Sequence, residues 1–143
     1  MLIFGQCRCG NLSFTLDWPS ELTAIPARAC TCSFCRTHRG VWTAAPGAKL
    51  QLHIAHPERL ERHRFATGSA EFLLCRQCKE VPAVTSEIDG RLYAVVNSHA
   101  LRTVDPARFD HRIVDFSGES LAERLARRQS HWIREVCIAS AAD

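Results

Sequence analysis

Short stretches of alternating apolar and polar residues dominate the hydrophobic pattern of this chain. In residues 11–17, Leu12, Phe14 and Leu16 fall on one face and polar residues fall on the other, which predicts a half-buried strand. Residues 23–29 are expected to be extended. Further strands are expected at residues 41–45, 50–54, 60–65 and 71–74.

One pair of strands has a strong turn signal between its members. Asp89-Gly90 separates the apolar runs 84–88 and 92–96, and this dipeptide favours the tight turn of a β-hairpin. A second turn, at residues 67–69, lies between two of the strands expected above. Short strands joined by turns predict a mainly β fold built of largely antiparallel sheets.

Two helical segments are also expected. Ser33 can cap a brief helical turn, and Gly40 can end it. Residues 120–123 form a capping-box pattern that opens a C-terminal helix. The apolar residues of this helix fall at helical spacing, at Leu121, Leu125 and Trp132. Its basic residues are interpreted as a solvated helix face, and they are Arg124, Arg127 and Arg128.

Length and composition indicate one ordinary domain covering residues 1–143. The chain is 46% hydrophobic, which is enough to bury a sizeable core. Its 18 Lys+Arg and 15 Asp+Glu give a net charge of +3, too mild for the basic stripe of a typical nucleic-acid-binding protein. The chain has no run of about 18 apolar residues, so no membrane span is expected. No secretory signal is visible at the N-terminus, and we expect a cytoplasmic protein.

Cysteine is the residue type that changes this picture most. The chain has eight cysteines, and a cytoplasmic setting favours metal binding over disulfides. Seven of them fall into three clusters, namely Cys7/Cys9, Cys30/Cys32/Cys35 and Cys75/Cys78. The eighth, Cys137, lies in an apolar run and is interpreted as a buried thiol.

The clusters can be divided between two zinc sites. Two cysteine pairs far apart in sequence can close one four-thiolate site, which leaves the triplet for a second site with a free position. A different division joins Cys30 and Cys32 to Cys75 and Cys78. Two other chemistries stay open, because a single C-x-x-C can be a redox dithiol and C-x-C-x-x-C can hold an iron–sulfur cluster.

The combined cysteine pattern resembles that of a known family. Gly5-Gln6-Cys7-Arg8-Cys9-Gly10, then Cys30-Thr31-Cys32-Ser33-Phe34-Cys35-Arg36, then Cys75-Arg76-Gln77-Cys78 are similar in order and spacing to the glutathione-dependent formaldehyde-activating (GFA) family. This family also includes centromere-protein-V-like domains. The segment 114–119, followed by an arginine-rich helix, looks like the tail of one branch of it. One departure is Lys79, because the family commonly has glycine directly after the last cysteine.

The resemblance implies a fold, two zinc sites and an activity. The fold is a β-tent of stacked antiparallel sheets. The structural zinc is held at positions matching Cys7, Cys9, Cys75 and Cys78. The second zinc lies at positions matching Cys30, Cys32 and Cys35, where the thiol substrate acts. The implied activity is that of a carbon–sulfur lyase, which joins glutathione and formaldehyde to S-hydroxymethylglutathione.

The donor set of the triplet favours thiol chemistry over hydrolysis. Three thiolates donate charge to zinc, so a bound water is acidified less than on zinc with three histidines, and a soft fourth ligand such as a thiolate suits the ion better. Glutathione is anionic as well, so nearby cations must offset the repulsion. The expected cations directly follow Cys35, and they are Arg36, His38 and Arg39. Trp42 is interpreted as a core residue, with a wall of the site as the alternative.

Two other classes of function compete with the enzyme. One is a non-catalytic binding module that zinc stabilises and whose β-tent surface holds a partner. The other is a redox protein, because methionine sulfoxide reductases of the B type have a similar zinc-bearing fold. Only Cys137 could serve as the nucleophile in that case. The three functions differ in their expected zinc content and in their effect on glutathione and formaldehyde.

Overall fold

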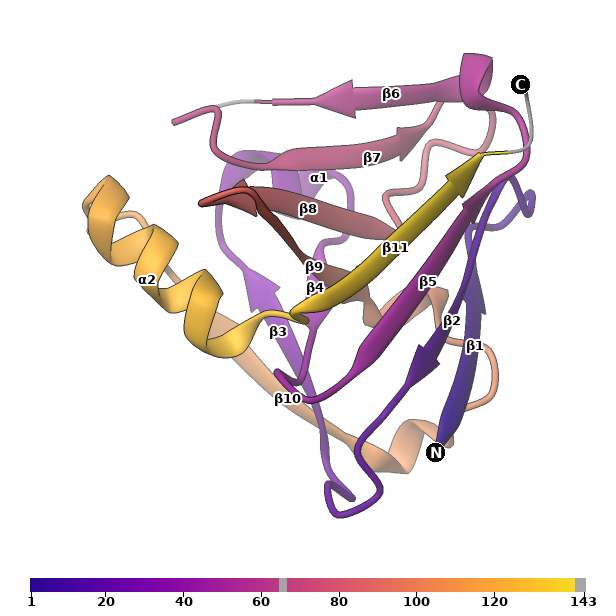
Figure 1. Ribbon diagram of the computed structural model, residues 1–143, viewed down its shortest axis with the longest axis horizontal. Coiled ribbons are helices and arrows are strands. Elements are labelled where there is room, and N and C mark those ends of the chain that lie inside the picture. Colours follow the sequence, from indigo (N-terminus) through magenta and orange to yellow (C-terminus); the bar gives the residue numbers. More distant parts are fainter. Residues whose placement is uncertain (65–66, 141–143) are drawn as a thin grey trace.

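The computed structural model describes residues 1–64 and 67–140, which form two mixed β-sheets with helices at their margins (Figure 1). The four-stranded sheet has the order β1 (Leu2–Gln6), β2 (Leu12–Asp17), β5 (Lys49–Ile54) and β11 (Glu135–Ser140). The seven-stranded sheet has the order β10 (Phe109–Val114), β3 (Ile25–Cys30), β4 (Val41–Thr43), β9 (Arg91–Asn97), β8 (Ala83–Ile88), β7 (Glu71–Cys75) and β6 (Leu60–His63). The helices are α1 (Ser33–Thr37) and α2 (Leu121–His131), and three short turns are η1 (Pro57–Arg59), η2 (Ser98–Ala100) and η3 (Pro106–Arg108).

The hydrophobic core draws side chains from both sheets. On β2 the buried residues are Leu12, Phe14 and Leu16, as the alternation in the sequence predicts. The inward face of β5 alternates in the same way, at Leu50, Leu52 and Ile54. Figure 1 shows these two strands on the right, facing β8 and β9 of the larger sheet. The mainly β fold is therefore confirmed.

The sheets are largely antiparallel, as expected, but two edge strands pair in parallel. β10 pairs with β3 in parallel, and β11 pairs with β5 in parallel. Both strands come from the C-terminal part of the chain, and each lies at the edge of its sheet. β1 was also not predicted, because its apolar residues fall on both faces, and Leu2 and Phe4 are exposed. Backbone pairing with β2, rather than an alternating pattern, defines this strand.

The hairpin and the C-terminal helix are confirmed. Asp89 and Gly90 have φ values of 52° and 77°, as expected for the tight turn that fits the twist of β8 and β9. At the start of α2 the Ser120 hydroxyl accepts from the Glu123 backbone N–H, and the Glu123 carboxylate accepts from the Ser120 N–H. None of the described helices is long and apolar enough to cross a membrane.

Two local predictions are corrected. Cys32, not Ser33, caps α1, since the Cys32 sulfur accepts from the Cys35 backbone N–H. Cys137 is exposed on β11, because Val136 and Ile138 are the residues of this strand that pack on the core. The strand expected at residues 60–65 is β6, which ends at residue 63, and residue 65 lies outside the described residues.

Candidate metal centres

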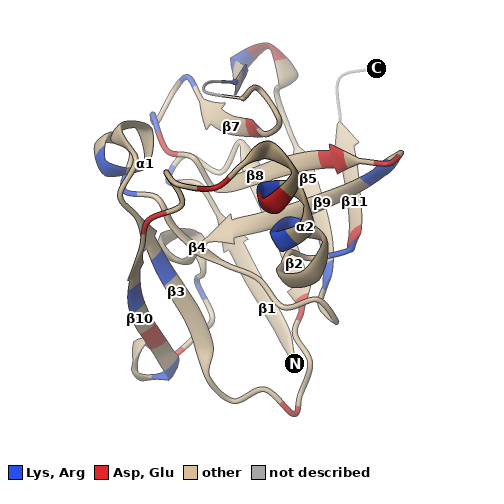
Figure 2. Cartoon of the chain, turned by 90° about the vertical axis from the view of Figure 1, so that its left-hand side faces the viewer, with Lys and Arg blue, Asp and Glu red and all other residues tan. Residues whose placement is uncertain are grey.

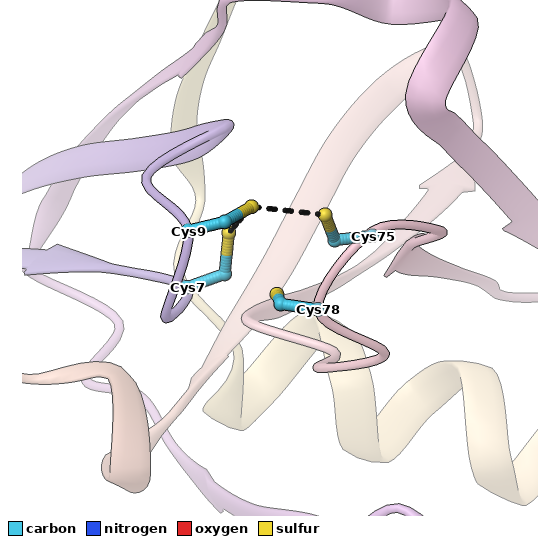
Figure 3. A group of neighbouring side chains, drawn as sticks. All are labelled: Cys7, Cys9, Cys75 and Cys78. Carbon is cyan, nitrogen blue, oxygen red and sulfur yellow. Dashed lines mark hydrogen bonds between the residues drawn. The ribbon is translucent and has the colours of Figure 1, made fainter.

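Four cysteines from distant parts of the chain converge on one point. Cys7 and Cys9 lie in the turn after β1, and Cys75 and Cys78 lie at the end of β7 and in the following turn. The Sγ atoms of Cys7 and Cys9 are 3.7 Å apart, and those of Cys9 and Cys75 are 3.4 Å apart. All four Sγ atoms lie within 4.8 Å of one another, and Figure 3 shows them facing a common centre. A zinc tetrahedron with bonds of about 2.3 Å has edges of about 3.8 Å, so this cluster fits the ion.

Hydrogen bonds between side chains and backbone groups hold the two cysteine turns together. The Glu80 carboxylate accepts from the Arg8 backbone N–H at 2.5 Å, and the Arg8 guanidinium donates to the Cys78 carbonyl oxygen at 3.0 Å. Lys79 has a φ of 66°, in the left-handed region that glycine adopts most easily. Lys79, which stands where the family commonly has glycine, therefore keeps a backbone conformation that suits glycine.

Burial disfavours negative charge on these thiols when no cation is present. It raises the pKa of Cys7 to about 12, and it also raises the pKa of Cys75. For Cys78, burial acts in the same direction, but hydrogen bonds from the backbone of Cys9 and Glu80 and from the side chains of Cys75 and Cys7 together lower the pKa to about 7. Four thiolates can therefore coexist here only around a positive ion.

The remaining three clustered cysteines form a separate group. Cys30 ends β3, Cys32 caps α1 and Cys35 lies one helical turn later, so the chain folds the triplet around one point. Their Sγ atoms also lie within 4.8 Å of one another. Within residues 1–64 and 67–140, no fourth Cys, His, Asp or Glu joins the group. The division into four and three cysteines is the first of the two alternatives above. Two N–H groups donate to the sulfurs, one from the Cys35 backbone at 3.4 Å and one from the Trp42 indole at 3.3 Å.

The triplet can hold one negative charge without a metal. A hydrogen bond from the Cys35 side chain lowers the pKa of Cys30 to about 6, against the opposing effect of burial, and the positive charge of Arg127 lowers it further. The same hydrogen bond, together with burial, raises the pKa of Cys35. A soft, all-sulfur donor set that needs a cation to ionise fully fits zinc.

The triplet opens into a cavity of about 770 Å³, whereas none of the four cysteines of the other cluster lines it. Trp42 and Phe72 form an aromatic part of the wall, so Trp42 is a wall of the site. The cations that line the cavity are Arg28, Arg124, Arg127 and Arg128. Figure 2 shows these basic positions on β3 and α2.

The structure corrects two sequence predictions about the basic residues. The α2 arginines are not a solvated face, because Arg128 is only 7% exposed and Arg124 and Arg127 are half-buried. The residues after Cys35 do not line this cavity. Arg36 is exposed and lines neither cavity, while His38 and Arg39 line a second cavity of about 350 Å³. The i, i+3, i+4 spacing of the α2 arginines places them on one helix face. This spacing is the feature of the sequence that could have predicted that the three arginines act together.

Comparison with known proteins agrees with the cysteine geometry. Residues 2–113 match the sequence model of the family described as glutathione-dependent formaldehyde-activating enzyme. The chain belongs to this family. The match ends within β10, so α2 and β11 lie outside the region by which the family is recognised.

One solved structure has a fold similar to that of this chain. A Rhodobacter sphaeroides protein, determined by crystallography as a structural genomics target, is 24% identical with a TM-score of 0.53. The alignment covers 73% of this chain and 92% of that chain. At this identity the likeness shows the fold alone. A search of curated proteins gives no match.

A packing prediction follows from Gly40, which lies between Cys35 and Trp42. A Cβ at this position would come within 2.7 Å of the Trp42 ring and 2.9 Å of the Cys35 Cβ. Gly40→Ala is expected to displace Trp42 from the Cys35 sulfur and to lower the free energy of unfolding by about 1–3 kcal/mol. Urea denaturation measures this effect. Gly118→Ala is the matched control, because a Cβ there meets nothing within 4 Å. Equal stability of the two variants would contradict the packing.

Proposed function

We propose that this protein is a zinc-dependent carbon–sulfur lyase that joins and separates a small thiol and an aldehyde, with glutathione and formaldehyde as the pair that the family name suggests. The observation that carries the proposal is the position of the cysteine triplet. It lines a cavity of about 770 Å³ and has no fourth side-chain ligand in the part of the chain that the structure describes.

Two zinc ions with different roles are proposed. Cys7, Cys9, Cys75 and Cys78 would hold a structural ion. Cys30, Cys32 and Cys35 would hold the second, which when bound supplies a positive charge that favours the thiolate form of an incoming thiol. The catalytic role of the triplet follows from this assignment.

The reaction needs little beyond a thiolate and a held aldehyde. The thiolate sulfur forms a bond to the carbonyl carbon, the C=O π bond opens, and its oxygen takes the proton that the thiol released. The reverse reaction breaks the same C–S bond. Holding both reactants in one cavity replaces a bimolecular encounter by an intramolecular one.

The residues around the triplet support this chemistry. The Trp42 and Cys35 N–H groups stabilise charge on the sulfurs by hydrogen bonds of 3.3 and 3.4 Å. The arginines of the cavity offset the negative charge of three thiolates and of an anionic thiol. Apolar side chains, including Phe72, Val84 and Val95, also line the cavity and give part of it an apolar surface.

The test is the exchange rate between glutathione, formaldehyde and their adduct, measured by proton NMR. Protein loaded with two zinc ions is expected to accelerate the exchange, and a mild chelator that removes one ion is expected to abolish the acceleration while the fold is retained. Two bound zinc ions with no acceleration would instead support a zinc-stabilised binding module. A single zinc with three reactive thiols would contradict the proposed second site.

A further inference from the structure

The second cavity, of about 350 Å³, shares no lining residue with the cavity of the cysteine triplet. Three cations line it, and each comes from a different segment: Arg8 follows β1, Arg39 follows α1 and Lys79 follows β7. All three residues are exposed, so a ligand from solvent can reach them. Cavities that bind small molecules measure about 300–1,000 Å³, and this cavity lies at the lower end of that range.

The second cavity has too little negative charge to balance its cations. Glu80 is the only acid among its lining residues, and its carboxylate already accepts from the Arg8 backbone N–H. In the part of the chain that the structure describes, none of the three cationic side chains forms an ion pair. The Arg8 guanidinium donates to the Cys78 carbonyl oxygen, which is neutral. Three cations and one carboxylate leave a formal charge of +2, which attracts anions.

Two of these cations are held in a backbone conformation that glycine adopts more easily. Arg39 and Lys79 have φ values of 56° and 66°. Among the other described residues that are not glycine, only Asp89, in the turn between β8 and β9, has a positive φ. Residues in such conformations cluster at sites that bind ligands. The chain therefore places cationic side chains in this cavity at two positions where glycine would fit the backbone better.

The buried Asn97 fixes the Arg39 side of the cavity. Its side-chain amide donates to the carbonyl oxygens of Arg39 and Val81, at 3.3 and 3.1 Å, and its side-chain oxygen accepts from the His99 backbone N–H at 3.2 Å. His99 lines the same cavity, and its pKa is lowered, first by burial and then by the positive charge of Arg39. The charge of Arg39 therefore acts within the cavity.

We propose that the second cavity binds the phosphate group of a small phosphate monoester, held by Arg8, Arg39 and Lys79. A phosphate monoester carries nearly two negative charges at pH 7 and has three terminal oxygens, which three cations from separate segments can contact. A carboxylate offers one charge and two oxygens in one plane, which suits a single arginine. The volume of the cavity leaves room for an organic group beside the phosphate. This site is independent of the thiol reaction proposed above.

The test compares ligands of similar size and different charge. Calorimetry with the zinc-loaded protein, at one ionic strength and without free zinc, measures the binding of glycerol 3-phosphate, inorganic phosphate, glycerate and glycerol. Glycerol 3-phosphate is expected to bind at least as tightly as inorganic phosphate and roughly tenfold or more tightly than glycerate, and glycerol is expected not to bind. Glycerate that binds as tightly as the ester would overturn the assignment to phosphate. Inorganic phosphate that binds more tightly would overturn the assignment to an ester.

Two variants locate the binding in the second cavity. Lys79→Gly and Arg39→Gly each remove one cation and supply a residue that adopts the left-handed backbone readily. Each is expected to weaken the binding of glycerol 3-phosphate by roughly tenfold or more. Arg36→Gln is the matched control, because this exposed arginine loses the same charge and lines neither cavity. Unchanged binding in both glycine variants, or an equal loss in the control, would overturn the site.

Three further measurements separate this site from the metal centres. Circular dichroism and metal analysis are expected to show that both glycine variants stay folded and keep their zinc. Loss of zinc with unchanged binding of glycerol 3-phosphate would show that the cations only balance the thiolates. Saturating glutathione is expected to leave the binding of glycerol 3-phosphate unchanged, because the two cavities share no lining residue. Competition between the two would overturn a separate site, whereas a failure of the exchange reaction alone would concern only the proposed function.

Discussion

Cys75→Ser is expected to unfold the protein under conditions in which the wild type is folded. Cys75 is fully buried at the end of β7, and its sulfur lies 3.4 Å from that of Cys9. Zinc bound by four thiolates contributes on the order of 10 kcal/mol to folding, whereas a domain of this kind has a total stability of about 5–15 kcal/mol. Losing one ligand therefore removes a large share of the stability. Circular dichroism and thermal unfolding with and without added zinc measure the effect.

The control for this variant is Cys137→Ser, which changes a thiol of the same chemistry outside both clusters. Cys137 is exposed on β11, so the substitution is expected to change the free energy of unfolding by less than about 0.5 kcal/mol. If Cys75→Ser melts like the control, the four-cysteine cluster does not stabilise the fold.

Cys32→Ser is expected to abolish the exchange activity while the protein stays folded and keeps one zinc ion. The substitution replaces a thiolate ligand by a weakly coordinating hydroxyl. It keeps the helix cap, because serine accepts from a backbone N–H at this position at least as well as the Cys32 sulfur does. The activity is expected to fall to the uncatalysed rate. Metal analysis and the NMR exchange assay on the same sample measure both effects.

The pair Cys75→Ser and Cys32→Ser separates the two sites. Cys75→Ser is expected to unfold the protein. Cys32→Ser is expected to remove only the activity and the second zinc ion. Comparable unfolding of both variants would show that the triplet is structural as well. Wild-type activity in folded Cys32→Ser would remove the triplet from the reaction.

Much of the fold was readable from the sequence because the signals were local. The alternation in β2 and β5, the Asp89-Gly90 turn and the capping box at Ser120 each act over a few residues. The cysteine clusters were readable for a similar reason, since their spacing within each turn is a property of the chain. Which cluster joins which was left open, and the folded arrangement settled it.

The elements that sequence patterns missed are defined by partners that lie far along the chain. β10 and β11 have mostly exposed side chains, and each is a strand because its backbone pairs with β3 or β5. The α2 arginines were misread for the same reason. Their helix periodicity is visible, but the surface on which α2 packs, including Ser69 and Ser86, is set by the tertiary fold.

The most direct test of two unequal metal sites is a crystal structure of the zinc-loaded protein with anomalous scattering measured at the zinc edge. The account predicts two peaks. The peak at the four-cysteine cluster should have four sulfur ligands, and the peak at Cys30, Cys32 and Cys35 should have a water or a thiol as its fourth ligand. A triplet without a peak, or one completed by a fourth side chain of the protein, would contradict it.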